Sequence, residues 1–124
     1  MFFSFLDLFG QNNKFKTVDV AEFAKAVADT SYVVLDVRTP AEHAEGHIPG
    51  THFNIDVLED SYTAVVLKTL PKDKSVALYC RSGNRSKTAA RILAENGYHV
   101  LELGTGFKGW AEAGNEVETS TEKQ

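Results

Sequence analysis

The chain has 124 residues, enough for one domain with a single core, and its 43% hydrophobic and 24% charged residues are ordinary for a globular protein. A net charge of −4 argues against nucleic acid or an anionic membrane as the main partner. Cys80 is the only cysteine, which excludes an intramolecular disulfide and any zinc site built from several cysteines.

The first 15 residues form an apolar N-terminal arm. Its large apolar side chains are spaced as on one side of a short helix: Phe2, Phe5, Leu6 and Phe9. The arm lacks the features of a signal peptide and is too short to be a transmembrane segment. We interpret it as an arm that packs on its own domain or on a second copy of the chain through residues 2–9. A helix that docks on a partner or lies on a membrane surface is the alternative.

Residues 16–117 are predicted to form the domain, and residues 118–124 a polar, acidic tail. The chain is expected to fray from Glu116 onward. Strands are predicted at 16–18, 32–37, 51–57, 75–79 and 99–103, with 51–57 at an edge. Helices are predicted at 20–27, 58–70, 86–96 and 106–114. This alternation predicts an α/β domain with a central, mainly parallel sheet of about five strands, covered on both faces.

Several residues mark where these elements begin and end. Asp19, followed by Glu22, is typical of a capping box at a helix start. Thr39 and Pro40 begin a loop or a short helix. Gly97 is expected to end the helix that starts at Ser86.

Cys80 stands where the third buried-type strand, "SVALY", ends and the next helix is about to begin. No acidic residue lies between Cys80 and Arg91, although the chain as a whole is acidic. In a parallel sheet, ligands bind outside the carboxyl ends of the strands. The sequence therefore predicts a site at Cys80.

The loop "CRSGNRS" provides the means to stabilise a thiolate. Its residues are Arg81, Ser82, Gly83, Asn84, Arg85 and Ser86. Gly83 and Asn84 tolerate a positive φ, so the loop can turn its N–H groups inward as an anion-binding nest. The following helix N-terminus and two arginines add positive charge. We expect Cys80 to be an accessible thiol with a lowered pKa. An inert buried cysteine is the alternative, but it leaves the cationic loop unexplained.

Supporting residues are expected at the same sheet edge. Asp36 and Arg38 follow the strand "YVVLD" and are predicted to orient the loop, to pair with Glu42, or to form an ordinary structural ion pair. The spacing of His43 and His47, with His52 nearby, raises a metal hypothesis. Gly46 and Pro49 make a regular helix doubtful there, and no carboxylate or thiol completes a ligand set, so no metal site is predicted.

The active loop "CRSGNRS" resembles that of the rhodanese family of sulfurtransferases, in particular its single-domain bacterial form. "LDVRTPAEHAEGHIPG" (35–50) is similar to the first signature of the family and "GFKGW" (106–110) to its last. The family commonly has a Gly-Gly pair where this chain has Thr105-Gly106. The resemblance covers residues 16–117 and implies a three-layer α/β/α fold, with His47 hydrogen-bonded locally in the "GHIPG" turn.

The resemblance implies a ping-pong reaction. The Cys80 thiolate would take the outer sulfur of thiosulfate or another anionic sulfane donor, and the resulting persulfide would pass it to a thiol, cyanide or a protein. No metal or organic cofactor is required. A reducing compartment, the cytoplasm, would suit this chemistry.

Two other functions remain open at the sequence level. Cysteine phosphatases and arsenate reductases also place a cysteine and an arginine on an anion-binding loop, but with five residues between them rather than the four between Cys80 and Arg85. A persulfide carrier or a protein-interaction module with a dedicated partner is the other alternative.

Overall fold

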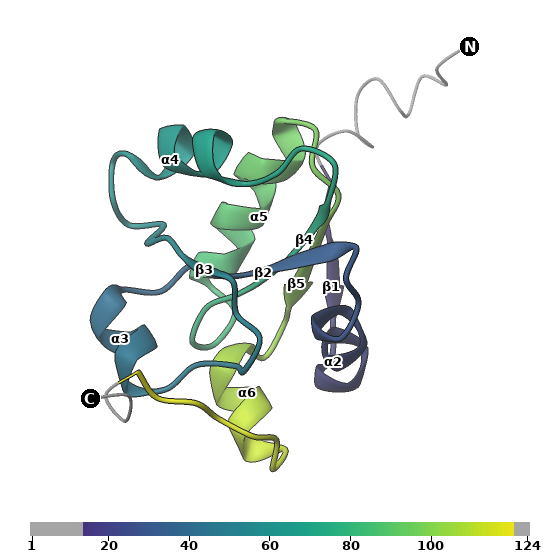
Figure 1. Cartoon of the computed structure of the whole chain (residues 1–124), viewed down its shortest axis with the longest axis vertical. Coiled ribbons are helices and arrows are strands. Elements are labelled where there is room, and N and C mark those ends of the chain that lie inside the picture. The colour runs from purple at the N-terminus through teal and green to yellow at the C-terminus, as the bar shows by residue number, and fades with distance from the viewer. Residues whose placement is uncertain (1–13, 121–124) are drawn as a thin grey trace.

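The computed structural model describes residues 14–120, so residues 1–13 of the predicted arm, including its apolar positions at 2–9, lie outside the described residues. The elements in chain order are β1 (Lys16–Val18), α2 (Val20–Val27), β2 (Tyr32–Asp36), α3 (Pro40–Glu45), β3 (Phe53–Asn54), α4 (Tyr62–Thr69), β4 (Ser75–Tyr79), α5 (Arg85–Glu95), β5 (Val100–Leu103) and α6 (Gly106–Glu112) (Figure 1).

The five strands form one sheet in the order β1-β5-β4-β2-β3, and every neighbouring pair is parallel. The predicted fold class is therefore confirmed. Of the described residues, no helix is long and apolar enough to cross a membrane.

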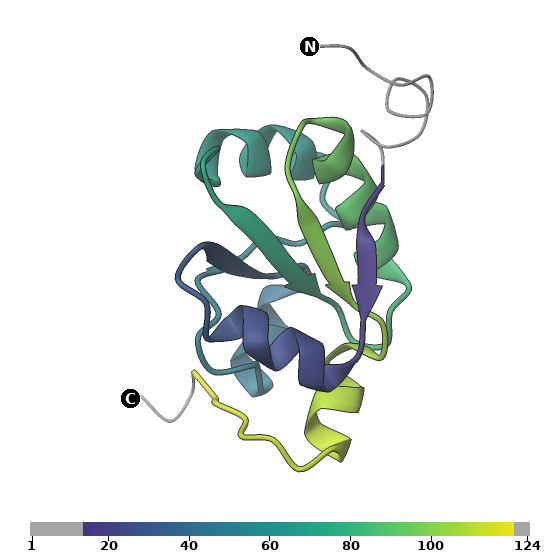
Figure 2. The ribbon, with the colours of Figure 1, turned by 90° about the vertical axis from the view of Figure 1, so that its right-hand side faces the viewer.

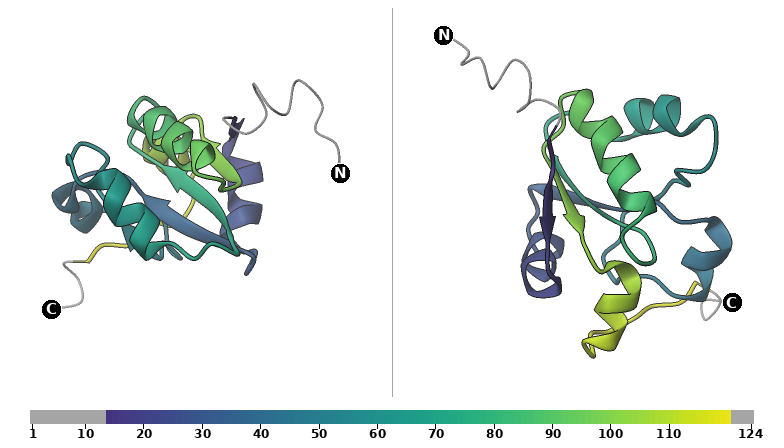
Figure 3. Two further views of the ribbon diagram at one scale, coloured as in Figure 1. Left: turned by 90° about the horizontal axis from the view of Figure 1, so that it is seen from above. Right: turned by 180° about the vertical axis from the view of Figure 1, so that it is seen from behind.

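Two apolar layers cover the sheet because successive side chains of a strand point to opposite faces. On β4, Val76 and Leu78 pack against α4 and α5, whereas Ala77 and Tyr79 pack against α2 and α6. Figure 2 shows α2 on one side of the strands and α5 on the other, and the view from above in Figure 3 shows the same separation. The result is the three-layer α/β/α arrangement that the resemblance implied.

Most local predictions are confirmed, with differences at the ends of elements. The segment after Thr39 is a short helix with a complete capping box formed by Thr39 and Glu42. At α2, the Asp19 side chain accepts from the amide of Glu22, which is half of the predicted box. The strand predicted at 51–57 is reduced to the two residues of β3. Beyond β3, the amide of Ile55 donates to the carbonyl of Asp36, the last residue of β2, and the amide of Val57 donates to the carbonyl of Val37.

The expected fraying from Glu116 is wrong for the residues that the structure describes. Glu118 forms an antiparallel bridge with His47, and the amide of Ser120 donates to the carbonyl of Ala44. The indole Nε1 of Trp110 donates to the carbonyl of Glu116. The segment from 116 to 120 is thus fastened to α3 and α6, because its backbone supplies partners that these elements lack.

Candidate active site

Cys80 follows directly after β4, at the carboxyl edge of the sheet, and lies at the base of the loop formed by residues 81–86. The amide of Gly83 donates to its sulfur at 3.1 Å. The residue is only 1% exposed, so the expectation of an accessible thiol is wrong for this structure.

The pKa of the Cys80 thiol is set by two opposing effects. Burial alone favours the neutral thiol and raises the pKa. Hydrogen bonds from the hydroxyl and amide of Ser86 and from the amides of Gly83 and Ser82 outweigh burial, so the pKa lies below its ordinary value. The expected direction is confirmed, and its main cause is the nest of hydrogen-bond donors rather than the arginine charges.

Glycine is required at two points that shape this nest. Gly83 has φ +103°, and a Cβ there would overlap with the carbonyl oxygen of Gly104. Gly106 has φ +67°, and a Cβ there would overlap with the backbone of Arg81. Thr105 has φ −94°, a value open to any residue, which explains why the first glycine of the usual family pair can be replaced here.

The start of α6 holds the loop in place from outside. The amide of Phe107 donates to the carbonyl of Cys80 at 2.8 Å, and that of Lys108 donates to the carbonyl of Arg81 at 3.0 Å. These two bonds satisfy the carbonyls on the outer side of the loop, which leaves the loop amides directed inward. Asn84 has a right-handed backbone conformation, so the positive φ that its residue type would tolerate is not used.

Arg85 opens α5, one residue earlier than predicted, and forms a two-pronged ion pair with Glu42 at 2.8 and 2.9 Å. The guanidinium of Arg85 holds the pKa of Glu42 at about 2. The sequence predicted full positive charges at both Arg81 and Arg85, whereas in the structure Glu42 of α3 neutralises part of the charge of Arg85. Arg81, by contrast, is exposed at the mouth of the loop.

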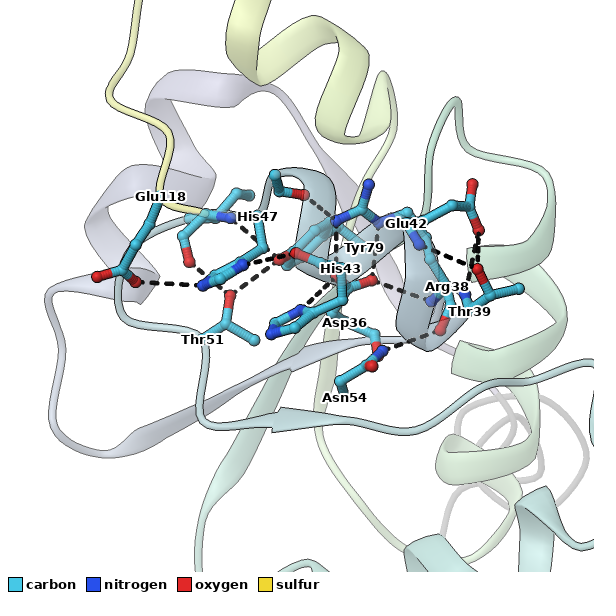
Figure 4. Close-up of polar contacts among 12 residues, drawn as sticks. Asp36, Arg38, Thr39, Glu42, His43, His47, Thr51, Asn54, Tyr79 and Glu118 are labelled. Carbon is cyan, nitrogen blue, oxygen red and sulfur yellow. Dashed lines mark hydrogen bonds and ion pairs between the residues drawn. The ribbon is translucent and has the colours of Figure 1, made fainter. Parts of the chain in front are cut away.

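Asp36 and Arg38 form a buried ion pair, as one of the sequence alternatives proposed. Arg38 Nη2 lies 2.7 Å from Asp36 Oδ2 and also donates to the carbonyl of Gly46 at 2.6 Å (Figure 4). The guanidinium lies over the Phe107 ring, 4.5 Å from its centroid. Arg38 therefore ties β2 to the turn after α3 and to α6. Glu42, which was considered as its partner, pairs with Arg85 instead.

The histidines take structural positions. The rings of His43 and His47 stack with centroids 3.8 Å apart, and His47 Nδ1 lies 2.8 Å from the carbonyl oxygen of His43, the local bond that the family likeness implied. His43 Nδ1 lies 2.9 Å from Asp36 Oδ2 (Figure 4). His52 instead bonds to the amide of Val34 through Nδ1.

Two carboxylates near the loop were not predicted from the sequence. Glu42 forms an ion pair with Arg85, and Glu102 on β5 is fully buried. The signal for Glu102 was present, since it is the one charged residue of the predicted strand "HVLEL". A charged side chain inside a strand covered on both faces needs partners, which indicates a buried polar network.

A hollow of about 290 Å³ lies beside the mouth of the loop. Arg38, Arg81, Glu42, Phe107 and Val117 contribute to its walls, so it combines charged groups of both signs with apolar surface. Arg81, the residue that follows Cys80 in the chain, is the part of the loop that lines it.

A parallel α/β sheet with a cysteine in an amide-lined loop at its carboxyl edge defines the class of protein: an α/β protein with a thiol surrounded by hydrogen-bond donors. Residues 19–113 match the sequence model of the Rhodanese-like domain. The chain therefore belongs to the rhodanese family, and its similarity to named relatives places it with the sulfurtransferases.

These relatives cover most of the domain. The chain is 40% identical to a sulfurtransferase of Allochromatium vinosum, over 78% of this chain and 89% of that protein. It is 28% identical to the thiosulfate sulfurtransferase GlpE of Pseudoalteromonas translucida, over 82% and 94%. The crystal structure of a rhodanese-related protein from Thermoplasma volcanium superposes with a TM-score of 0.73 at 31% identity, covering 84% of this chain and 98% of that one.

Proposed function

We propose that this protein moves a sulfane sulfur from an anionic donor such as thiosulfate to a thiophilic acceptor through a persulfide on Cys80. The observation that carries the proposal is the ring of donors around the Cys80 sulfur, which includes the amides of Ser82, Gly83 and Ser86. N–H groups fixed around one sulfur atom favour a thiolate and equally favour an anionic persulfide at the same place.

The chemistry requires no additional reagent. The Cys80 thiolate attacks the outer sulfur of thiosulfate, the bond between the two donor sulfurs breaks, and sulfite leaves with the electron pair. The persulfide that remains carries one negative charge on its outer sulfur. Attack by an acceptor thiolate or cyanide on that sulfur then restores the Cys80 thiolate.

The charged groups at the mouth of the loop have separate roles in this proposal. Arg81 is exposed and attracts the doubly negative donor toward the buried sulfur. Arg85 is held by Glu42, so its guanidinium is fixed in position but its net attraction for an anion is reduced. The hollow beside Arg81 is the place where an acceptor can approach the persulfide.

The reaction is tested by mass spectrometry of the intact protein. Incubation with thiosulfate should raise the mass by one sulfur atom, and cyanide should remove that mass. Cys80→Ser is the control and should take up no sulfur. If the wild-type protein gains no sulfur, or if Cys80→Ser gains as much, the proposal is wrong.

The same preparation separates the other candidate functions. Phosphatase and arsenate-reductase assays run in parallel should show no turnover, because the loop has four residues between Cys80 and Arg85. A persulfide that forms but reacts with neither cyanide nor small thiols would instead indicate a carrier that serves a dedicated protein partner.

A further inference from the structure

A second hollow lies at the edge of the sheet opposite to Cys80. It has a volume of about 750 Å³, and the first residues of four strands line it: Lys16 of β1, Tyr32 of β2, Ser75 of β4 and Val100 of β5. Figure 2 shows that these strands run in one direction, so their amino ends share this edge, whereas Cys80 follows the carboxyl end of β4. None of the reaction steps above uses this hollow, which we call the amino-end groove.

Apolar side chains from both layers of the fold line the amino-end groove. Phe15 packs on the layer formed by α4 and α5, whereas Tyr32 and Leu101 pack on the layer formed by α2 and α6. All three line the groove and are only half-buried, so part of each side chain stays uncovered within residues 14–120. Apolar surface that is left uncovered in this way, with the exposed Lys14 and His99 beside it, is typical of a binding surface.

Residues 2–9, which lie outside the described residues, have a sequence pattern that fits such a surface. Their large apolar side chains fall on one side of a helix: Phe2, Phe5, Leu6 and Phe9. Asp7, the only charged side chain among residues 1–13, falls on the other side together with Ser4. A helix with one apolar face is stabilised mainly by packing that face against another apolar surface.

The dimensions of the arm and of the groove agree. The groove crosses β1, β5, β4 and β2, and three spacings between neighbouring strands amount to about 14 Å. A helix over residues 2–9 would be about 12 Å long. The linker of residues 10–13 reaches at most about 14 Å from Lys14, which itself lines the groove. The arm is therefore attached at the groove and is long enough to cross it.

We propose that the amino-end groove binds the N-terminal arm of the same chain through the apolar face formed by Phe2, Phe5, Leu6 and Phe9. Because the linker is short, the effective concentration of the arm at its own groove is in the millimolar range, which favours this arrangement over binding to a second copy. No residue of the active loop lines the groove, so the proposal does not rest on the proposed function.

The test is paramagnetic broadening of amide resonances in the full chain. A nitroxide is attached to Ser4→Cys in the Cys80→Ser background, which leaves one thiol, on the side of the arm away from its apolar face. The amide signals of Ser75, Val100 and Leu101 should lose most of their intensity, whereas that of Gly83, in the active loop, should keep it. Intact signals at the three groove residues would overturn the proposal.

The matched control separates a bound arm from one that is merely attached nearby. Replacing two apolar positions, Phe5→Ser with Phe9→Ser, should restore the intensity at Ser75 and Leu101 although the nitroxide and the linker are unchanged. Equal broadening with and without these two substitutions would overturn the proposal. So would broadening of ¹⁵N-labelled chains without a nitroxide when they are mixed with nitroxide-bearing ¹⁴N chains, because the arm would then occupy the groove of a second copy.

Urea unfolding supplies an independent measurement. Phe5→Ser should lower the urea midpoint, Ser4→Ala should leave it unchanged, and the loss from Phe5→Ser should be much smaller in the Leu101→Ala background. An undiminished loss in that background would contradict the proposal. Sedimentation of the wild-type protein, but not of the variant with Phe5→Ser and Phe9→Ser, with vesicles of phosphatidylcholine and phosphatidylglycerol would also overturn it, because the apolar face would then serve a membrane surface.

Discussion

The amide of Gly83 reaches the Cys80 sulfur because the backbone at Gly83 turns through φ +103°, close against Gly104. The backbone conformation of Gly83 therefore determines the shape of the nest at this point. A side chain at Gly83 would displace the loop. The amides that lower the pKa of Cys80 would then lose their hydrogen bonds to the sulfur. The conformation and the close approach therefore both require glycine.

Gly83→Ala tests this requirement at the residue scale. We expect a loss of more than about 3 kcal/mol in unfolding free energy, or a loop that no longer binds sulfur, because strain and a backbone overlap act together. Gly97→Ala is the matched control: Gly97 has φ +92° but no atom near the added Cβ, so it should cost about 1 to 2 kcal/mol. Urea unfolding and sulfur uptake measure both effects. Equal losses in the two variants would contradict the argument.

At the scale of elements, the ion pair between Glu42 and Arg85 joins α3 to the start of α5. Glu42 serves α3 twice, in the capping box with Thr39 and in the pair with Arg85. Both partners of the pair are partly exposed, so its contribution to stability is modest. Its more important consequence is to fix Arg85, which begins the helix that also carries Ser86.

Glu42→Gln should lower the unfolding free energy by about 0.5 to 1 kcal/mol at neutral pH. The pKa of Glu42 is depressed from its ordinary value to about 2 in the folded protein. The advantage of the wild-type protein should therefore be complete above about pH 4.5 and should decline as the pH falls toward 2. Urea unfolding at several pH values measures it. A difference between the two proteins that grows in acid would contradict this sign.

At the scale of the whole molecule, the segment from Glu116 to Ser120 closes the fold around the first signature region. His47 and Glu118 exchange two backbone hydrogen bonds, and Trp110 donates its indole N–H to the carbonyl of Glu116. His47 also contacts the Glu118 carboxylate through Nε2. The C-terminal end of the domain thus supports α3, which in turn holds Arg85.

Removing residues 116–124 should destabilise the protein by about 2 to 4 kcal/mol, because the backbone and side-chain hydrogen bonds between His47 and Glu118, the bond from Ser120 to Ala44 and the indole bond of the buried Trp110 disappear. The matched control ends the chain after Ser120 and keeps all of these contacts. Its urea midpoint should equal that of the full chain. If both truncations have the same midpoint as the full chain, the segment does not support the fold.

The features of the site that could be predicted are those that depend on residues close together in the sequence. Cys80 at a strand end, Gly83 as turn residue and the helix after it are local features, and all are found in the structure. Glu42 and Glu102 were not connected to the loop in advance, since they lie 43 and 16 residues from their partners Arg85 and Ser86. Side chains that far apart in sequence meet only through the tertiary arrangement of strands and helices.

The sequence alone determined the α/β class, the number of strands and the place of the cysteine, because apolar periodicity and turn residues act over short distances. Only the tertiary structure decided which charges meet. The order β1-β5-β4-β2-β3 places Glu102 between Thr17 and Ser86, and the packing of α3 brings Glu42 to Arg85. The electrostatics of the loop depend on those long-range contacts, which neutralise part of a charge cluster that appears unpaired in the sequence.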